Sequence, residues 1–71
     1  MQEDQLLRAI GRNVRSLRIQ RKLTQEETAH LAQIDPKHLQ KLERGIINVT
    51  ARTLARLAAT FKVNPTKLLQ D

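Results

Sequence analysis

Apolar side chains recur at helical spacing through most of this 71-residue chain. From about residue 6 to residue 20 they step by four, four and three positions, which places them on one helical face. That face contains Leu6, Ile10, Val14 and Leu17. No segment alternates apolar and polar residues with a period of two, so no strand is predicted. The pattern indicates an all-helical protein whose polar residues 1–5 are expected to fray.

Capping residues divide the next part of the chain into two more helices. The run Thr24–Glu27 is a capping box, which begins a second helix that ends near Ala32. Asp35 can cap a third helix, and Pro36 suits its first turn because a missing N–H costs nothing there. Gly45 can supply the left-handed residue that ends it. Only about three residues join these two helices, so they must cross steeply.

Two further start signals complete the predicted fold. Thr50 is placed to cap a fourth helix, and Asn64-Pro65 repeats the cap-then-proline signature before a short fifth helix through Leu69. Gly11 interrupts the first helix, which either a close contact with another helix or plain tolerance explains. At this length we expect one domain over residues 1–71. Its predicted core is Leu17, Leu23, Ile34, Leu39, Leu42, Leu54, Leu57 and Phe61.

Charge favours a polyanionic partner. Thirteen Lys and Arg against seven Asp and Glu give a net charge of +6 and a pI near 10.9, although an ordinary basic surface would give the same numbers. Phe61 is the only aromatic residue, so base stacking on aromatic side chains is poorly supported. No apolar run is long enough to span a bilayer and no signal peptide opens the chain, so a cytoplasmic protein is expected.

Catalytic and metal chemistry find little support in the residues present. The chain has no cysteine, and His30 and His38 lie eight positions apart among basic and apolar neighbours, so we predict no metal site. Two glycines cannot form a Gly-rich phosphate loop. No paired carboxylates and no nucleophile–histidine–acid set are evident, and no cofactor or small-molecule ligand is implied. An enzyme is therefore disfavoured.

The third predicted helix has two distinct faces. On a 3.6-residue wheel Leu39 and Leu42 point inward, whereas the opposite face is cationic and carries no acid. That outward face contains Lys37, Gln40, Lys41 and Arg44. Such a helix can enter a major groove, where bases offer acceptors and phosphates offer charge. A surface helix with ordinary lysines is the competing interpretation.

Together these residues resemble the lambda-repressor-like helix-turn-helix family, the Cro and repressor type of bacteria and phages. The resemblance covers roughly Ile10 to Leu69. The strings that carry it are Leu17-Arg18, Leu23-Thr24-Gln25-Glu26-Glu27, Ala29, Leu39 through Gly45, Asn48, Thr50, Thr53 and Leu54. It implies a compact five-helix domain, with the helix-turn-helix formed by the second and third helices. It also implies a transcription regulator that acts on double-stranded DNA in the cytoplasm, at the nucleoid of a bacterium.

The resemblance assigns roles to individual residues. Lys37 and Lys41 fall where the family reads base edges, and Gln40 joins them from the same outward face. Gln25 would touch a phosphate and brace the third helix. The residues expected beside phosphates or at the rim of the groove are Gln25, His38, Arg44, Arg12 and Arg15. A structural pair, Arg18 and Glu43, would tie the first helix to the third.

Four positions depart from the family pattern. Gln33 stands where a turn glycine is usual, so either the turn differs or Gln33 bears a mild left-handed strain. Pro36 replaces a residue that contacts a base in some relatives, which removes direct readout there. Thr28 and Lys62 stand in place of a frequent leucine and a frequent glycine.

A homodimer on a palindromic operator is the expected assembly, because one such module makes few base contacts. The candidate dimer surface is Ile46, Ile47, Val49, Leu68 and Leu69, for which ordinary partial burial is an equally good explanation. The alternative function is a protein-interaction module of a toxin–antitoxin or phage regulatory pair. Dispensable lysines on the third helix, together with inactivating changes in the tail, would favour that alternative.

Overall fold

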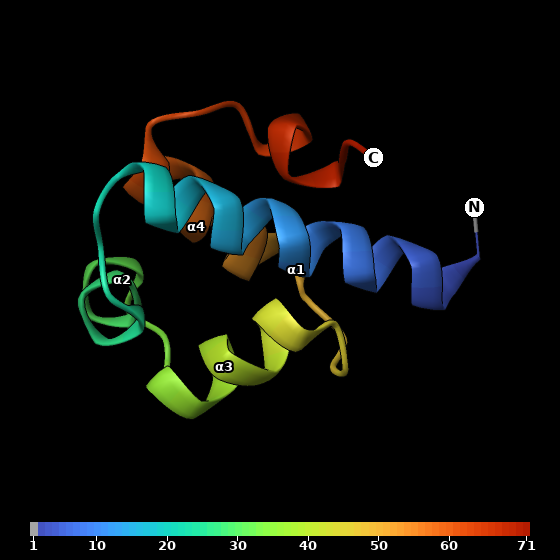
Figure 1. The fold of residues 1–71 in the computed structure, drawn as a ribbon, viewed down its shortest axis with the longest axis horizontal. Helices are drawn as coiled ribbons and strands as arrows, with labels where there is room; N and C mark the ends of the chain where they lie inside the picture. The colour runs from blue at the N-terminus through green and yellow to red at the C-terminus, as the bar shows by residue number, and fades with distance from the viewer. Residues whose placement is uncertain (1) are drawn as a thin grey trace.

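Helices make up all the regular structure of residues 2–71, the residues that the computed structural model describes (Figure 1). The elements are α1 (Glu3–Gln20), α2 (Gln25–Ala32), α3 (Pro36–Arg44), α4 (Ala51–Phe61) and the 3-10 helix η1 (Pro65–Leu69). The expected five helices are thus corrected to four α-helices and one 3-10 helix. The last segment has only five residues, and the tighter 3-10 geometry is used mainly in short pieces of chain.

The first helix begins earlier than its apolar pattern predicts. α1 starts at Glu3 rather than near Leu6, so the polar residues before Leu6 form its first turn. The Gln2 N–H donates to Gln5 Oε1 at 3.1 Å, which satisfies one of the amide groups that a helix start leaves unpaired. Glu3 and Asp4 also lie at the positive end of the helix dipole, where a negative charge is favourable.

The predicted N-caps of α2 and α3 are confirmed. The Glu27 N–H donates to Thr24 Oγ1 at 3.0 Å, and the Thr24 N–H donates back to Glu27 Oε1 at 2.9 Å. The backbone N–H of Thr24, and then its hydroxyl, lower the pKa of Glu27. At pH values above the ordinary pKa of glutamate this contact therefore stabilises the fold, and the stabilisation is lost as the pH falls through the lowered pKa. Asp35 caps α3 by accepting from the Lys37 N–H at 2.7 Å.

Left-handed residues end three of the helices. Gly45 ends α3 with φ of 74°, which a glycine adopts without strain. Gln33 ends α2 and Lys62 ends α4, each with φ of 58°. The turn between α2 and α3 therefore keeps its left-handed geometry, and Gln33 carries the strain, on the order of 1 kcal/mol for a side chain in this region.

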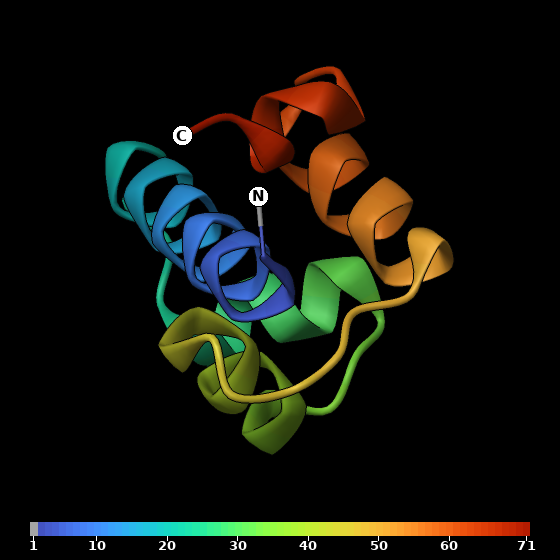
Figure 2. The same cartoon turned by 90° about the vertical axis from the view of Figure 1, so that its right-hand side faces the viewer.

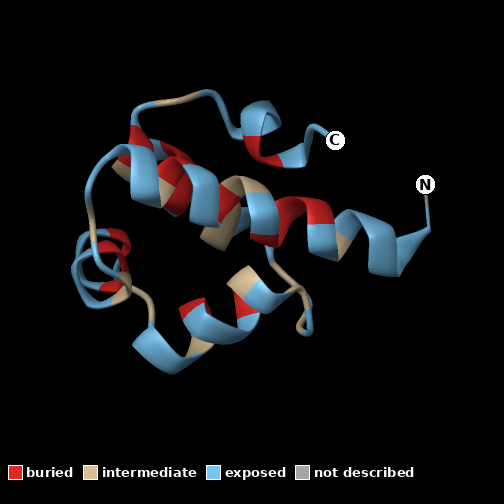
Figure 3. Cartoon of the chain, viewed as in Figure 1, coloured by how far each residue is buried: buried red, intermediate tan, exposed pale blue. Residues whose placement is uncertain are grey.

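The core lies where α1, α3, α4 and η1 meet, with α2 closing one end against α3 and α4 (Figures 1 and 2). The predicted core residues Leu17, Leu39, Leu42, Leu57 and Phe61 are buried, as the red segments of Figure 3 show. Leu23, Ile34 and Leu54 are half-buried and pack against that cluster. The sequence pattern missed Ala9 and Leu68, which are completely buried.

One polar group of the core has no hydrogen-bond partner within residues 2–71. Thr28 is completely buried on α2, and its hydroxyl makes no hydrogen bond. This is the position where the family resemblance leads us to expect leucine. A buried hydroxyl without a partner costs about 1–3 kcal/mol, so the departure from leucine lowers stability without disturbing the backbone.

Gly11 marks the closest approach between α1 and α3. A Cβ added to Gly11 would lie 2.6 Å from the carbonyl oxygens of both Leu42 and Glu43. Of the two explanations left open for this glycine, the close contact between helices is therefore the correct one. The backbone of α1 touches the last turn of α3 directly, and only glycine leaves room for that contact.

Replacing Gly11 by alanine should destabilise the protein. Alanine normally strengthens a helix by about 1 kcal/mol over glycine. Here the added methyl group must push α3 away from α1, and such overpacking costs about 1–3 kcal/mol. Urea unfolding of Gly11→Ala should thus show a lower free energy of unfolding than the unchanged protein. Ala55→Gly, at an exposed position of α4, calibrates helix propensity alone, and a gain in stability for Gly11→Ala would contradict the close contact.

Candidate nucleic-acid interface

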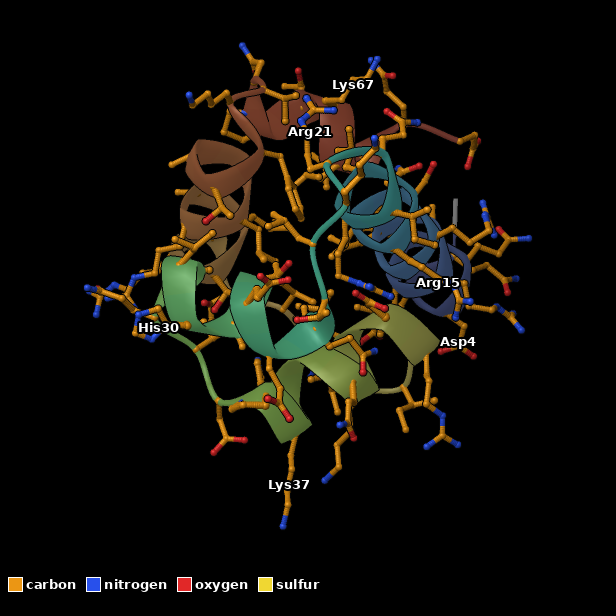
Figure 4. The ribbon with its side chains drawn as sticks, turned by 60° about the vertical axis from the view of Figure 1, so that its left-hand side comes forward. Asp4, Arg15, Arg21, His30, Lys37 and Lys67 are labelled. Atoms are coloured by element: carbon orange, nitrogen blue, oxygen red, sulfur yellow. The ribbon has the colours of Figure 1, made fainter. Side chains whose placement is uncertain are left out.

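The outward face of α3 is exposed and free of acids. Lys37, Gln40 and Lys41 are all solvent-exposed, whereas Leu39 and Leu42 anchor the opposite face in the core. Figure 4 shows Lys37 extending away from the body of the molecule at the exposed end of α3. The structure thus brings the three residues expected to read bases onto one side of a single helix. We define Lys37, Gln40 and Lys41 as the α3 reading face.

The N-terminal turns of the helices differ in charge. α1 and α2 each begin with two acids, which suits the positive end of the helix dipole. α3 and α4 have no acid in the first turn and instead carry Lys37 and Arg52 there. A cation at this end is unfavourable in the isolated molecule. At α4 free amide groups and an added cation together suit an anion such as a phosphate, whereas at α3 the Asp35 carboxylate already occupies the Lys37 N–H.

The sequence reasoning missed Arg52, an exposed residue of the first turn of α4. The loop of residues 46–50 leads from the end of α3 to this turn, on the side of the molecule that holds α3 (Figure 2). The sequence did contain a signal for Arg52, because a basic residue two positions after the capping residue Thr50 is unfavourable at the positive end of the helix dipole. Asn48, in the same loop, is also exposed.

A buried network holds α3 against α1 and α2. The Arg18 guanidinium donates from Nε to Glu43 Oε2 at 2.7 Å and from Nη2 to Glu43 Oε1 at 3.2 Å. Arg18 Nη1 donates in addition to the Leu23 carbonyl oxygen at 2.9 Å. The side chain of Glu43 is 3 % exposed and that of Arg18 is 13 % exposed. The pair is therefore shielded from water, with both forks of the guanidinium in use.

Gln25 connects α2 to the same carboxylate. Its Nε2 donates to Glu43 Oε1 at 3.1 Å, so Glu43 accepts hydrogen bonds from both α1 and α2. Gln25 is half-buried at the first position of α2. The contact uses one amide hydrogen, which leaves the second hydrogen and the amide oxygen for another partner. Gln25 thus makes the bracing contact with α3 that the family resemblance implied.

The remaining basic residues are spread over other parts of the surface. Arg44 is exposed at the far end of α3, and His38 is half-buried beside the α3 reading face. Arg12 and Arg15 are exposed on α1. Figure 4 shows Arg15 on a different side of the molecule from Lys37, so the structure does not bring Arg15 together with the α3 reading face.

The candidate dimer residues fall into three groups by burial. Ile46 and Leu69 are 56 % and 40 % exposed. Ile47 and Val49 are half-buried and pack against the core of their own chain. Leu68 is completely buried, with its carbonyl oxygen accepting from Asn13 Nδ2 at 2.9 Å, so it has no side-chain surface to offer a second copy.

Residues 2–71 contain neither a candidate metal site nor a candidate membrane-spanning helix. No three side chains among His, Asp and Glu lie close enough together to hold a metal ion. None of the described helices combines the length and the apolar character needed to cross a bilayer.

The chain matches a protein-family model described as a helix-turn-helix domain over residues 11–71. Its structure is similar to the restriction-modification controller protein C.AhdI from Aeromonas hydrophila, with 32 % identity, a TM-score of 0.84 and coverage of 87 % of this chain and 94 % of that one. It is also similar to the clp gene regulator ClgR from Corynebacterium glutamicum, with 30 % identity, a TM-score of 0.86 and coverage of 90 % and 68 %. A hypothetical transcription factor from Neisseria, NHTF, is 26 % identical with a TM-score of 0.89, over 99 % of this chain and 80 % of that one. No curated protein sequence matches the chain.

Removing the carboxylate of Glu43 should strongly destabilise the fold. Glu43→Ala leaves the buried Arg18 guanidinium without its counter-charge, which costs about 3–5 kcal/mol. Thermal unfolding followed by circular dichroism should show a large fall in the midpoint. The double variant Arg18→Ala/Glu43→Ala is the control, because it should lose less than the sum of the two single changes. Strictly additive losses, or an unchanged midpoint for Glu43→Ala, would contradict the coupling.

Proposed function

Because this chain belongs to the lambda-repressor-like family of helix-turn-helix DNA-binding transcription regulators, we propose that it binds a palindromic operator as a homodimer. In this proposal α3 of each protomer lies in the major groove. The observation that carries it is the exposed, acid-free α3 reading face on a helix held rigidly by the Arg18–Glu43–Gln25 network. Its place of action is then the compartment that holds the DNA.

The α3 reading face has the donors that base edges require. Lys37 and Lys41 lie one helical turn apart and can each donate to guanine O6 or N7. Gln40, between them, can donate to and accept from adenine in the bidentate manner of a carboxamide. Pro36 offers no side-chain donor, so we assign no polar base contact to the first residue of α3. Readout should therefore be centred on the two lysines.

Phosphates would be contacted from around this face rather than from it. The free amide hydrogen of Gln25 and the side chains of Arg44 and His38 surround the α3 reading face. Arg52 at the start of α4 adds a cation beside free amide groups. Arg15 lies farther around the molecule (Figure 4), and both it and the exposed Arg12 of α1 would reach phosphates only where the duplex continues past α3. These contacts fix register and add affinity, but they carry no sequence information.

A homodimer supplies what one protomer lacks. A single short helix reads only a few base pairs, whereas two helices related by a two-fold axis read two half-sites about 34 Å apart. The names of the similar structures, a restriction-modification controller and a gene regulator, describe those proteins and agree with a regulatory role here. Repression or activation would depend on where the operator lies and not on these contacts.

Affinity for DNA should fall steeply with salt concentration. Each phosphate neutralised by a cation lowers log K by about 0.9 per tenfold rise in salt. Titrations of a selected operator duplex between low and physiological salt should give a slope corresponding to several phosphates per protomer. Arg44→Ala should reduce that slope by about 1, while Lys67→Ala, on the side opposite Lys37, should leave it unchanged. A complex insensitive to salt would contradict the phosphate contacts.

Substituting the lysines of the reading face should abolish discrimination between sequences. Lys37→Ala or Lys41→Ala removes a base contact worth about 1–3 kcal/mol, so affinity for the operator should fall far more than affinity for random DNA. Arg15→Ala is the matched control, since it should weaken both equally or leave both unchanged. The operator is first selected from a random DNA pool, and paired titrations are then made at one salt concentration. If both lysine variants keep the operator-to-random ratio, α3 does not read sequence and an interaction module becomes the better interpretation.

A further inference from the structure

The N-terminal end of α1 extends beyond the rest of the molecule (Figure 1). Residues 3–8 are exposed apart from the half-buried Leu7, and Figure 3 shows this end as the most exposed stretch of the helix. The match to the helix-turn-helix family model begins only at residue 11. These first turns lie outside that match, and the proposed DNA contacts do not use them.

Exposed apolar side chains gather around this end of α1. Leu6 is 36 % exposed on the helix itself, and Ile46 is 56 % exposed in the loop that follows α3. Ile46 and Leu7 line one hollow of about 360 Å³. The three large apolar residues Leu6, Leu7 and Ile46 thus leave part of their surface in water at one end of the molecule. Ile19 and Leu31 are exposed to a similar degree elsewhere, so it is the combination of apolar and charged side chains that distinguishes this end.

Charges of opposite sign share the same hollow without pairing. Asp4, Arg8 and Arg44 line it together with the two apolar residues. Within residues 2–71 the ion pair at 4.0 Å or less is Arg18–Glu43, so Asp4 has no such contact with either arginine. Backbone packing fixes the floor of the hollow, since a Cβ on Gly45 would lie 2.9 Å from Arg8 Cα. We define the α1-end surface as Asp4, Leu7, Arg8 and Ile46; Arg44, at the edge of the hollow, is assigned to the DNA.

The mixture of charges decides what this surface can bind. A phosphate or another polyanion would meet the Asp4 carboxylate, and the adjoining hollow, lined by Arg8 and Arg12, contains Asp71 as well. A second copy of the same surface instead offers an arginine for each acid and an acid for each arginine. Contact about a two-fold axis requires this self-complementarity, because each side must present the same patch.

We propose that the α1-end surface is the homodimer interface, with Asp4 of each protomer facing the partner's Arg8 and with Leu7 and Ile46 buried between them. The inference rests on the proposed homodimer and names the surface that forms it. The overhanging end of α1 lies at one end of the longest axis of the molecule (Figure 1), so a two-fold axis there places the two protomers end to end and keeps their α3 helices apart, as two half-sites require.

The arrangement also leaves the first turn of α3 free. α3 meets α1 through its last turn, where Gly11 touches the carbonyl groups of Leu42 and Glu43. Lys37 lies at the other end of α3 and projects away from the body (Figure 4). A partner at the end of α1 therefore adjoins the last turn of α3, which carries Lys41, and leaves the first turn with Lys37 uncovered.

A charge-swap experiment tests this interface. The mass of the unchanged chain in solution, measured by sedimentation equilibrium, should reach twice 8.2 kDa. Asp4→Arg and Arg8→Asp each place like charges opposite one another at both symmetry-related contacts, so each should raise the dimer dissociation constant about tenfold or more. An equimolar mixture of the two variants should recover the dimer, because the introduced arginine then faces the introduced aspartate. Ile46→Glu should weaken the dimer through the apolar part of the surface.

Controls separate the interface from the fold and from the dimer itself. Glu26→Arg and Lys67→Glu make charge changes of the same size elsewhere and should leave the mass unchanged. Circular dichroism melting checks that each variant is folded. If the unchanged chain is a dimer and both Asp4→Arg and Arg8→Asp remain dimers, the α1-end surface is not the interface, whereas the proposed homodimer stands. If the unchanged chain stays a monomer both alone and on its operator, the homodimer fails and this interface with it.

Discussion

The contact between α1 and the last turn of α3 is the constraint on which the site depends. Gly11 lets the two backbones touch, and a Cβ there would come within 2.6 Å of two carbonyl oxygens. Two turns along α1 from Gly11, the Arg18 guanidinium binds Glu43 with two hydrogen bonds. The steric contact fixes the distance between the helices, and the charged contact fixes their rotation. A helix of only nine residues would not keep its outward face in a defined direction without such support.

The polar network orients α3 more than it adds to the stability of the fold. Two buried charges lose their hydration on folding, and the free energy of their attraction only about offsets the cost of that lost hydration. What the pair provides is a set of directional bonds, because Glu43 accepts from Arg18 and from Gln25 and thereby relates α3 to both preceding helices. Gln25 also lies at the start of α2, where its second amide hydrogen remains available. The same side chain can thus orient α3 and, in the proposed complex, contact the DNA backbone.

Much of this fold could be predicted from local rules, and what escaped prediction depended on contacts between distant residues. The caps at Thr24 and Asp35, the left-handed Gly45 and the inward leucines of α3 follow from residue type and spacing alone. The early start of α1 and the 3-10 form of the last helix depend on short polar segments with no apolar period. Leu68 looked like tail surface, and only the tertiary packing of η1 against α1 and α4 shows that it is core. Arg18 and Glu43 were identified through the family resemblance, since a spacing of 25 residues carries no local signal.

The distribution of charge along the helices connects stability with function. α1 and α2 begin with acids, which is the arrangement that stabilises a folded helix. α3 and α4 begin instead with Lys37 and Arg52, although each cation there opposes the helix dipole by a few tenths of a kcal/mol or more. At α4 the sign of that interaction would reverse in the proposed complex, because a phosphate placed between Arg52 and the free amide groups is attracted by both. At α3 the Asp35 carboxylate already caps the helix, and Lys37 is assigned to the bases instead. The start of α4 is therefore less favourable in the free protein than it could be, and binding of a phosphate would relieve the unfavourable contact.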